Sequence, residues 1–198
     1  MKKLLYTLLA VSIIFSACEE DTTLPAANNN TNNNNSALAI GDSHQGGIIF
    51  WLDGNGGGLI AAPSDQDSVA EWGCYGTSIP GADGTAIGTG AQNTIDIVNA
   101  NCFPFSAGSS LAADICANLT IGTYSDWFLP SKDELNEMYI NLHQQGLGGF
   151  ANNGYWSSTE NDLNDPGFHA ERQSFLDDGY QHLNVKFNAN AVRAVRAF

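Results

Sequence analysis

The chain has 198 residues, and its charge is sparse and strongly acidic, with 7 Lys and Arg against 21 Asp and Glu. A field of this sign repels nucleic acids and other polyanions, so the composition argues against any partner that Lys and Arg side chains would have to hold. It is compatible with cations, neutral glycans or proteins as ligands.

The first 17 residues have the sequence of segments that is typical of a secretory signal peptide. A basic start and an apolar run over 4–15 are followed by two small residues, and Cys18 comes directly after them. A cysteine at this point resembles the acylated residue of a bacterial lipoprotein, although Phe15 stands where that motif usually has Leu. We therefore expect a mature N-terminus at Cys18 whose acyl chains anchor it to a membrane. An ordinary signal peptide with an unrelated cysteine is the alternative.

We expect residues 18–38 to form an Asn-rich linker that is lipidated at its first residue. The acidic run at 19–21 resembles the surface-export signal of lipoproteins in some Gram-negative bacteria, and a solvated acidic start is the alternative. The stretch 26–37 has almost no apolar side chain to bury, so it cannot offset its ordering entropy and is expected to stay disordered. This interpretation places the exported protein in the outer membrane, exposed at the cell surface.

Residues 39–198 are enough for one ordinary domain with its own core. Without the two leader lysines, 5 basic groups face 21 acidic ones, which gives a mature net charge of about −16. Apolar runs at 46–53 and 58–62 predict two strands, and the Asp-Gly-Asn-Gly sequence between them predicts a hairpin turn. The glycine-rich stretch 71–90 predicts an irregular surface loop.

Three helices are predicted in the middle of the chain. The first is capped by Asn93 or Thr94, and the second starts near residue 110. The third begins with a capping box from Ser131 to Glu134, in which each residue bonds the backbone of the other. The apolar stripe of the first helix consists of Ile95, Val98 and Cys102.

The C-terminal part predicts a late antiparallel sheet. Its strands are expected at 155–160, 173–176, 182–187 and 191–198, and the last carries Arg193 and Arg196, which we expect to pair with carboxylates. An early hairpin, two to three helices and a late sheet together predict an α+β fold rather than a doubly wound sheet.

Three cysteines follow the lipidated one, namely Cys74, Cys102 and Cys116. Because three is odd, at most one internal disulfide can form in the oxidising compartment that export implies. Cys102 and Cys116 are the preferred pair, since each lies in a predicted helix and a short turn joins the two helices. A bridge between Cys74 and Cys102 is the alternative.

Several strings together resemble one bacterial family. They are GGIIFWLD, GLIAAPSDQ, EWGCYGT, GTAIGTGAQNT, DWFLPSKDELNEMY, YWSSTE and VRAVRAF. Over 41–198 they resemble the Lcl C-terminal domain, a bacterial domain of unknown function that is also found at the end of collagen-like adhesins. The resemblance implies a C-type-lectin-like fold, related to sulfatase-modifying factors, and adhesion or ligand binding more than catalysis.

Two departures limit what the resemblance implies about binding. The adhesin relative is similar to a binder of sulfated polysaccharides, which needs positive charge, whereas this domain is strongly acidic. The Glu-Pro-Asn, Gln-Pro-Asp and Trp-Asn-Asp strings of calcium-dependent lectins are absent from the sequence. The fold is therefore expected to carry over without the binding chemistry.

The candidate ligand-binding residues are Trp127, Trp156, Glu160 and Asp162. Aromatic rings can stack on sugars, but Trp in such apolar strings is more often part of the core. Glu160, Asp162 and Asp165 lie in an oxygen-rich stretch that predicts a calcium site, with a solvated acidic loop as the more ordinary explanation. No other cofactor is expected.

The sequence thus predicts a membrane-anchored lipoprotein that displays a non-catalytic binding or adhesion module. The ligand is expected to be a glycan or a protein, and nucleic acid is not expected as a partner. The alternative is an enzyme on a sulfatase-modifying-factor-like fold, which would need a suitably placed pair of thiols for a metal.

Overall fold

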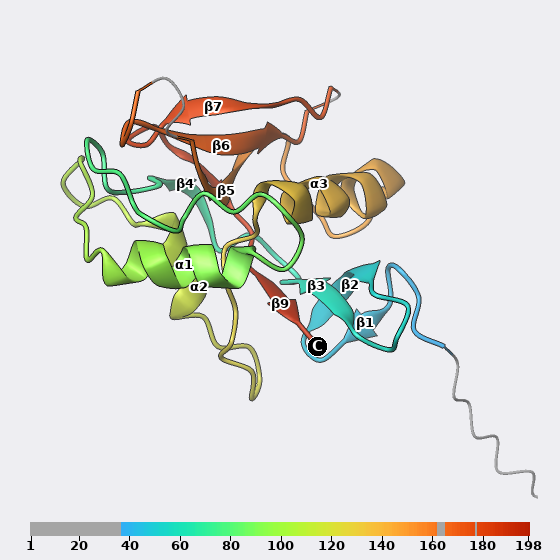
Figure 1. Ribbon diagram of the computed structural model, residues 1–198. Coiled ribbons are helices and arrows are strands. Elements are labelled where there is room, and N and C mark those ends of the chain that lie inside the picture. The colour runs from blue at the N-terminus through green and yellow to red at the C-terminus, as the bar shows by residue number, and fades with distance from the viewer. Residues whose placement is uncertain (1–36, 162–164, 177) are drawn as a thin grey trace, which may run out of the picture. The chain divides into compact units, whose positions relative to one another are not determined.

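The computed structural model describes residues 37–161, 165–176 and 178–198, which belong to one compact unit beginning at Ala37 (Figure 1). Helices and strands are mixed in this unit, and the strands form two sheets, so the predicted α+β class is confirmed. The expected signal peptide, Cys18 and most of the linker lie outside the described residues.

The first sheet is antiparallel and contains the predicted early hairpin. Its strands, in spatial order, are β1 (Ser43–His44), β2 (Gly47–Leu52), β3 (Gly58–Ala61) and β9 (Val195–Ala197). The turn between β2 and β3 is closed by the carboxylate of Asp53, which accepts the backbone N–H groups of Asn55 at 2.7 Å and Gly57 at 3.0 Å. This local bond explains why the turn was predictable from its residues.

The second sheet is mixed. In spatial order it contains β4 (Asp67–Ala70), β8 (Asn190–Val192), β5 (Gly154–Glu160), β6 (His169–Ser174) and β7 (Gln181–Val185). Only the contact between β5 and β8 is parallel among the described strand pairs. The expected single strand at 191–198 is therefore wrong, because β8 and β9 belong to different sheets.

The chain crosses between the sheets at two arginines that form ion pairs, and the Arg193 side chain is fully buried. Arg193 is paired with Asp65 and donates to the backbone carbonyl of Ala62 at 2.9 Å, and Arg196 is paired with Asp126. The expectation that both arginines pair with carboxylates is confirmed. The first of these pairs holds the crossing point between β8 and β9 in place.

Helices and loops cover the sheets (Figure 1). The helical elements are α1 (Gly90–Asn99), α2 (Ala112–Ala117), α3 (Lys132–Asn141) and the single 3-10 turn η1 (His143–Gln145). No helix in the described ranges is long and apolar enough to cross a membrane.

The start and the buried face of α1 differ from the prediction. The helix begins before Asn93 and Thr94, which lie inside it and are buried rather than capping it. The amide of Asn93 donates to the carbonyl of Gly84 at 2.7 Å, and Thr94 accepts the backbone N–H of Leu129 at 3.0 Å. Because tertiary hydrogen bonds satisfy this polar face, it packs inward, and Ile95 of the predicted apolar stripe is 51% exposed.

The predicted capping box of α3 is confirmed. The hydroxyl of Ser131 accepts the N–H of Glu134 at 3.3 Å, and the Glu134 carboxylate accepts the N–H of Ser131 at 2.7 Å. The same carboxylate accepts the N–H of Gly88 at 2.8 Å, so it also fixes the loop before α1. Burial raises the pKa of Glu134, and these N–H groups act in the opposite direction. A Cβ at Gly90 would overlap this carboxylate, which explains the glycine there.

Candidate functional site

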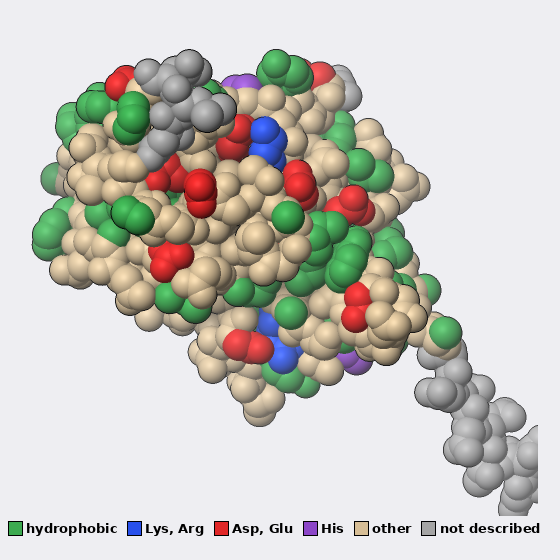
Figure 2. Space-filling model, viewed as in Figure 1, with side chains coloured by type: hydrophobic (Ala, Val, Ile, Leu, Met, Phe, Trp, Pro, Cys, Tyr) green, Lys and Arg blue, Asp and Glu red, His purple; other side chains and the backbone are tan. Residues whose placement is uncertain are grey.

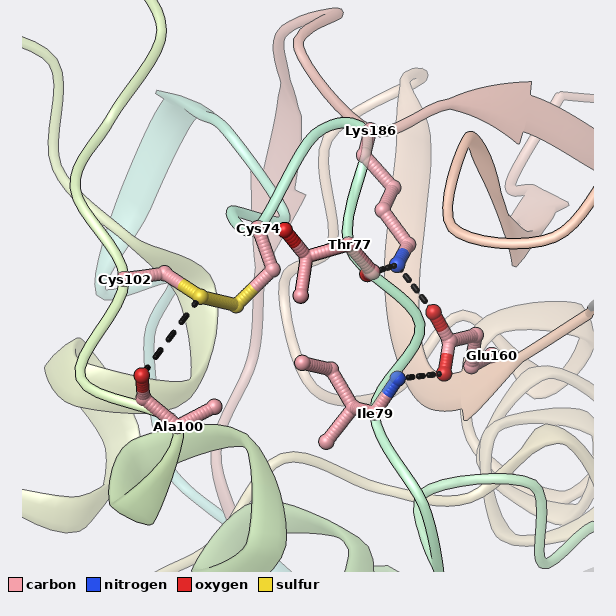
Figure 3. Close-up of a disulfide and its surroundings, with 7 residues drawn as sticks. All are labelled: Cys74, Thr77, Ile79, Ala100, Cys102, Glu160 and Lys186. Atoms are coloured by element: carbon pink, nitrogen blue, oxygen red, sulfur yellow. Dashed lines mark hydrogen bonds and ion pairs between the residues drawn. A yellow bond between two sulfur atoms is a disulfide. The ribbon is translucent and has the colours of Figure 1, made fainter.

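The disulfide joins Cys74 to Cys102, with 5.0 Å between their Cα atoms (Figure 3). The preferred prediction, Cys102 with Cys116, is wrong, and the alternative pairing is the one that the structure contains. The reason is that α1 ends before Cys102, and Asn101, at a φ of 51°, redirects the chain toward Cys74. Cys116 points from α2 into the core as a free thiol, and burial raises its pKa.

The disulfide anchors the segment 101–110, which we call the aromatic loop. Its second anchor is Glu71, whose carboxylate accepts the backbone N–H groups of Phe105 at 2.7 Å and Ser106 at 2.9 Å. The backbone N–H of Glu71 also donates to the carbonyl of Ser110 at 3.0 Å. Since Glu71 is itself buried, these contacts tie the loop to the core at its start, its middle and its end.

The aromatic loop exposes two large apolar rings. Phe103 is 82% exposed and Phe105 is 64% exposed, more than any other described Phe or Trp. Phe105 stacks on Phe187 at 5.1 Å between ring centroids and lies edge-on to Tyr75 at 5.3 Å. Tyr75 also contacts Phe168 at 5.0 Å. In Figure 2 hydrophobic side chains gather along the left margin, over the loops on that side of the molecule.

Two hollows flank Phe103. The first, which we call the Tyr75 hollow, has a volume of about 490 Å³ and lies between Tyr75, Thr77 and the start of the aromatic loop. The second, which we call the Asp114 hollow, has a volume of about 540 Å³ and lies between the aromatic loop and α2. Phe103 and Pro104 belong to the walls of both. Exposed aromatic rings therefore border two concave surfaces, which is an arrangement that can hold a ligand.

A buried ion pair lies close to this site. Lys186 and Glu160 are paired, with side chains that are 0% and 2% exposed (Figure 3). The Lys186 ammonium also donates to the carbonyl of Thr77 at 2.9 Å, and the second carboxylate oxygen of Glu160 accepts the N–H of Ile79 at 2.6 Å. The pair therefore fixes the segment that follows Cys74 and supports the Tyr75 hollow from inside the protein.

The two candidate tryptophans are core residues, and the core explanation that the sequence favoured is confirmed. Trp156 is 0% exposed, and its indole N–H donates to the carbonyl of Ala70 at 3.0 Å. Trp127 is 3% exposed and donates to the carbonyl of Tyr124 at 3.2 Å. The Trp156 ring presents no free face at the surface. Trp127 does form one wall of an apolar cavity of about 350 Å³ beside α1.

The expected calcium residues are not brought together by what the structure describes. The carboxylate of Glu160 is engaged by Lys186, Asp165 is exposed, and Asp162 lies outside the described residues. Within the described ranges, no group of three or more His, Cys, Asp or Glu side chains is arranged to hold a metal ion. The calcium site stays a prediction.

Sequence reasoning missed the aromatic loop and the groups that support it. A signal was present, since the string CFPFSAGSS places two Phe residues in a stretch of small and polar residues that has no helical or strand period. The roles of Glu71 and Lys186 had no such signal, because their partners are distant in the sequence. In comparisons with known proteins, no family model matches the chain, and no curated protein matches it either.

Proposed function

We propose that this protein is an exported, membrane-anchored lipoprotein whose folded domain is a non-catalytic binding or adhesion module for a glycan or protein ligand. The observation that carries the proposal is the exposure of Phe103 and Phe105 on a loop held by the Cys74–Cys102 disulfide and by Glu71. The aromatic loop and its two flanking hollows are the proposed contact surface.

Physical reasons favour binding at this loop. Exposed Phe side chains leave apolar surface in contact with water. When a partner covers that surface, its removal from water contributes favourable free energy to binding. Aromatic residues are also over-represented among the interface residues that contribute most of the binding free energy. Because the loop is already ordered, a ligand does not have to meet the entropy cost of ordering it.

The distribution of charge narrows the ligand class. The mature chain has 5 basic groups, and four of them, Lys132, Lys186, Arg193 and Arg196, are in ion pairs with carboxylates. A sulfated or phosphorylated polymer would have to approach a net charge of about −16 with few cations free to receive it. The ligand is therefore proposed to be neutral or cationic.

No observation favours the alternative enzyme. A sulfatase-modifying-factor-like activity would need a pair of thiols, but Cys74 and Cys102 are joined to each other. That leaves Cys116 as the single free cysteine in the described part of the chain. The sequence resemblance to the Lcl C-terminal domain and to C-type-lectin-like folds supports the binding proposal instead.

The binding proposal predicts that Phe103→Ala weakens ligand binding by about tenfold or more, because an anchoring ring is lost. Full-length protein in detergent micelles would be labelled and applied to an array of neutral glycans, sulfated glycans and matrix proteins, with calcium and with EGTA. The EGTA arm reports separately on the predicted calcium site.

The matched control for Phe103→Ala is Tyr180→Ala, which removes a ring that is 65% exposed and lies on β7's side of the second sheet, outside the aromatic loop. The control should bind like the wild type. Equal loss in both variants, or a wild-type protein that binds nothing on the array, would contradict the proposed function.

The anchoring proposal predicts that Cys18→Ser releases the protein from the membrane, because the thiol that carries the acyl chains is absent. Membrane and soluble fractions would be compared, and the intact mass of the wild-type protein extracted from membranes would locate the lipid. Cys116→Ser, which leaves Cys18 intact, should stay membrane-bound. A Cys18→Ser protein that remains in the membrane fraction would refute the lipid anchor.

A further inference from the structure

We infer that the Asp114 hollow is a subsite for one ring of a neutral sugar, with Phe103 stacking on the ring and the Asp114 carboxylate accepting its hydroxyl groups. This inference rests on the proposed function, because it names the ligand class for one side of the aromatic loop. The inference is based on the residues that line the hollow and on the hydrogen bonds that they make.

The hollow has the lining that such a ligand needs. It is a shallow, open hollow with a volume of about 540 Å³, so a single sugar ring would lie against its surface rather than be enclosed by it. It is lined by Phe103 and Pro104 of the aromatic loop and by Asp114, Ile115 and Asn118 of α2 and its C-terminal end. A sugar ring in this hollow would have both an aromatic side chain and a carboxylate among its neighbours.

The carboxylate of Asp114 lacks a protein partner. Its side chain is half-buried and accepts no hydrogen bond from any residue that the structure describes, whereas its backbone carbonyl accepts the Asn118 amide at 2.9 Å. Burial raises the pKa of Asp114, because the charged form is partly withdrawn from water without a compensating donor. Ligand hydroxyl groups would supply the missing donors.

The remaining wall residues favour a neutral ligand over a charged one. The hollow contains no Lys or Arg, and its other polar side chains are the neutral amides and hydroxyls of Asn101, Ser109, Ser110 and Asn118. The carboxylate of an acidic sugar would be repelled by the Asp114 carboxylate, and no Lys or Arg of the hollow would offset the repulsion. A simple cation would use that carboxylate but none of the amide and hydroxyl donors, whereas sugar hydroxyls both donate and accept.

Both parts of the lining of the hollow are anchored to the rest of the domain. Cys102 belongs to the hollow and is fixed by its disulfide to Cys74. On the other side, α2 buries Ala112, Ala113 and Cys116 in the core, which holds the face that carries Asp114. Preorganised groups of this kind lower the cost of binding.

The test titrates full-length protein in detergent micelles with four neutral probes, and detects binding by saturation-transfer NMR. The probes are methyl mannoside, methyl glucoside, methyl galactoside and N-acetylglucosamine, with glucuronic acid and choline as the acidic and cationic comparisons. At least one neutral probe should bind, and Asp114→Asn and Phe103→Ala should each weaken it about tenfold. Asp83→Asn, an exposed Asp in another loop, should leave binding unchanged.

The pH dependence gives an independent readout for Asp114. The pKa of Asp114 is raised in the folded protein, so the folded state binds this proton more tightly than the unfolded chain does. The ionised carboxylate therefore lowers the stability of the fold, and protonation at lower pH removes that cost. Sugar binding should therefore weaken as the pH falls through that raised pKa, and Asp114→Asn should abolish this dependence. The same variant should melt at an equal or higher temperature than the wild type, which separates loss of binding from loss of folding.

Three results would overturn the subsite in distinguishable ways. If no neutral probe binds while Phe103-dependent binding to the array persists, the neutral-sugar subsite is wrong and the proposed function stands. If choline binds through Asp114 and the sugars do not, the subsite recognises cations instead. If Phe103→Ala changes no binding at all, the subsite and the proposed function both fail.

Discussion

Replacing Lys186 with Met is expected to lower the free energy of unfolding by about 3–5 kcal/mol, because the Glu160 carboxylate would remain buried without its cation. The side chains of the pair are 0% and 2% exposed, so water cannot replace the lost partner. Lys186 also lies 4.5 Å from the centre of the Trp72 ring, a contact that Met would keep only as packing. Urea denaturation followed by Trp fluorescence would measure the change.

The chain offers a matched control for this prediction. Lys132 pairs with Glu171 at 3.1 Å, but the Lys132 side chain is 29% exposed. The Glu171 carboxylate is 7% exposed, but water reaches the pair from the Lys132 side and the Asn161 amide also donates to Glu171 at 3.0 Å, so Lys132→Met should cost less than Lys186→Met, about 1–2 kcal/mol. The double variant Lys186→Met/Glu160→Gln should recover part of the stability lost in Lys186→Met, since it removes the buried charge. Equal costs for the two lysine variants would contradict the buried-pair account.

Removing the disulfide with Cys74→Ser/Cys102→Ser is the second large effect. The bridged residues are separated by 28 positions, and a closed loop of that size is worth about 3.5 kcal/mol when the unfolded chain is released from it. The variant should also lose ligand binding on the array, because the start of the aromatic loop would no longer be held beside Tyr75. Reductant should produce the same two changes in the wild-type protein.

Cys116→Ala is the control for the disulfide prediction. This variant keeps the bridge, so reductant should lower its stability by as much as in the wild type. Peptide mapping under non-reducing conditions should link Cys74 to Cys102 and leave Cys116 free for alkylation after unfolding. A peptide that links Cys116 to either of the others would refute the pairing, and unchanged binding after reduction would show that the disulfide does not hold the loop.

The sequence by itself determined the elements that depend on neighbouring residues. The hairpin turn at Asp53 and the capping box of Ser131 and Glu134 are closed by bonds that span two to four positions. Such bonds form between residues that the chain already holds close together, so residue type and spacing are sufficient to predict them. The α+β class followed from the order of these elements.

Tertiary structure decided the features that depend on distant partners. Asn93 was predicted as a cap but is buried in α1, because its amide reaches the hydroxyl of Ser158, 65 positions away. Glu160 is paired with Lys186 and accepts a bond from the N–H of Ile79, 81 positions away, and the sequence around Glu160 gave no sign of either partner.

The candidate site belongs to the same group of features. The exposure of Phe103 and the approach of Cys102 to Cys74 depend on where α1 ends and on the anchoring of the aromatic loop by Glu71. Each of these contacts exists only after folding has brought separate segments together. Local spacing and periodicity carry no information about such contacts, since many chain arrangements satisfy the same local pattern.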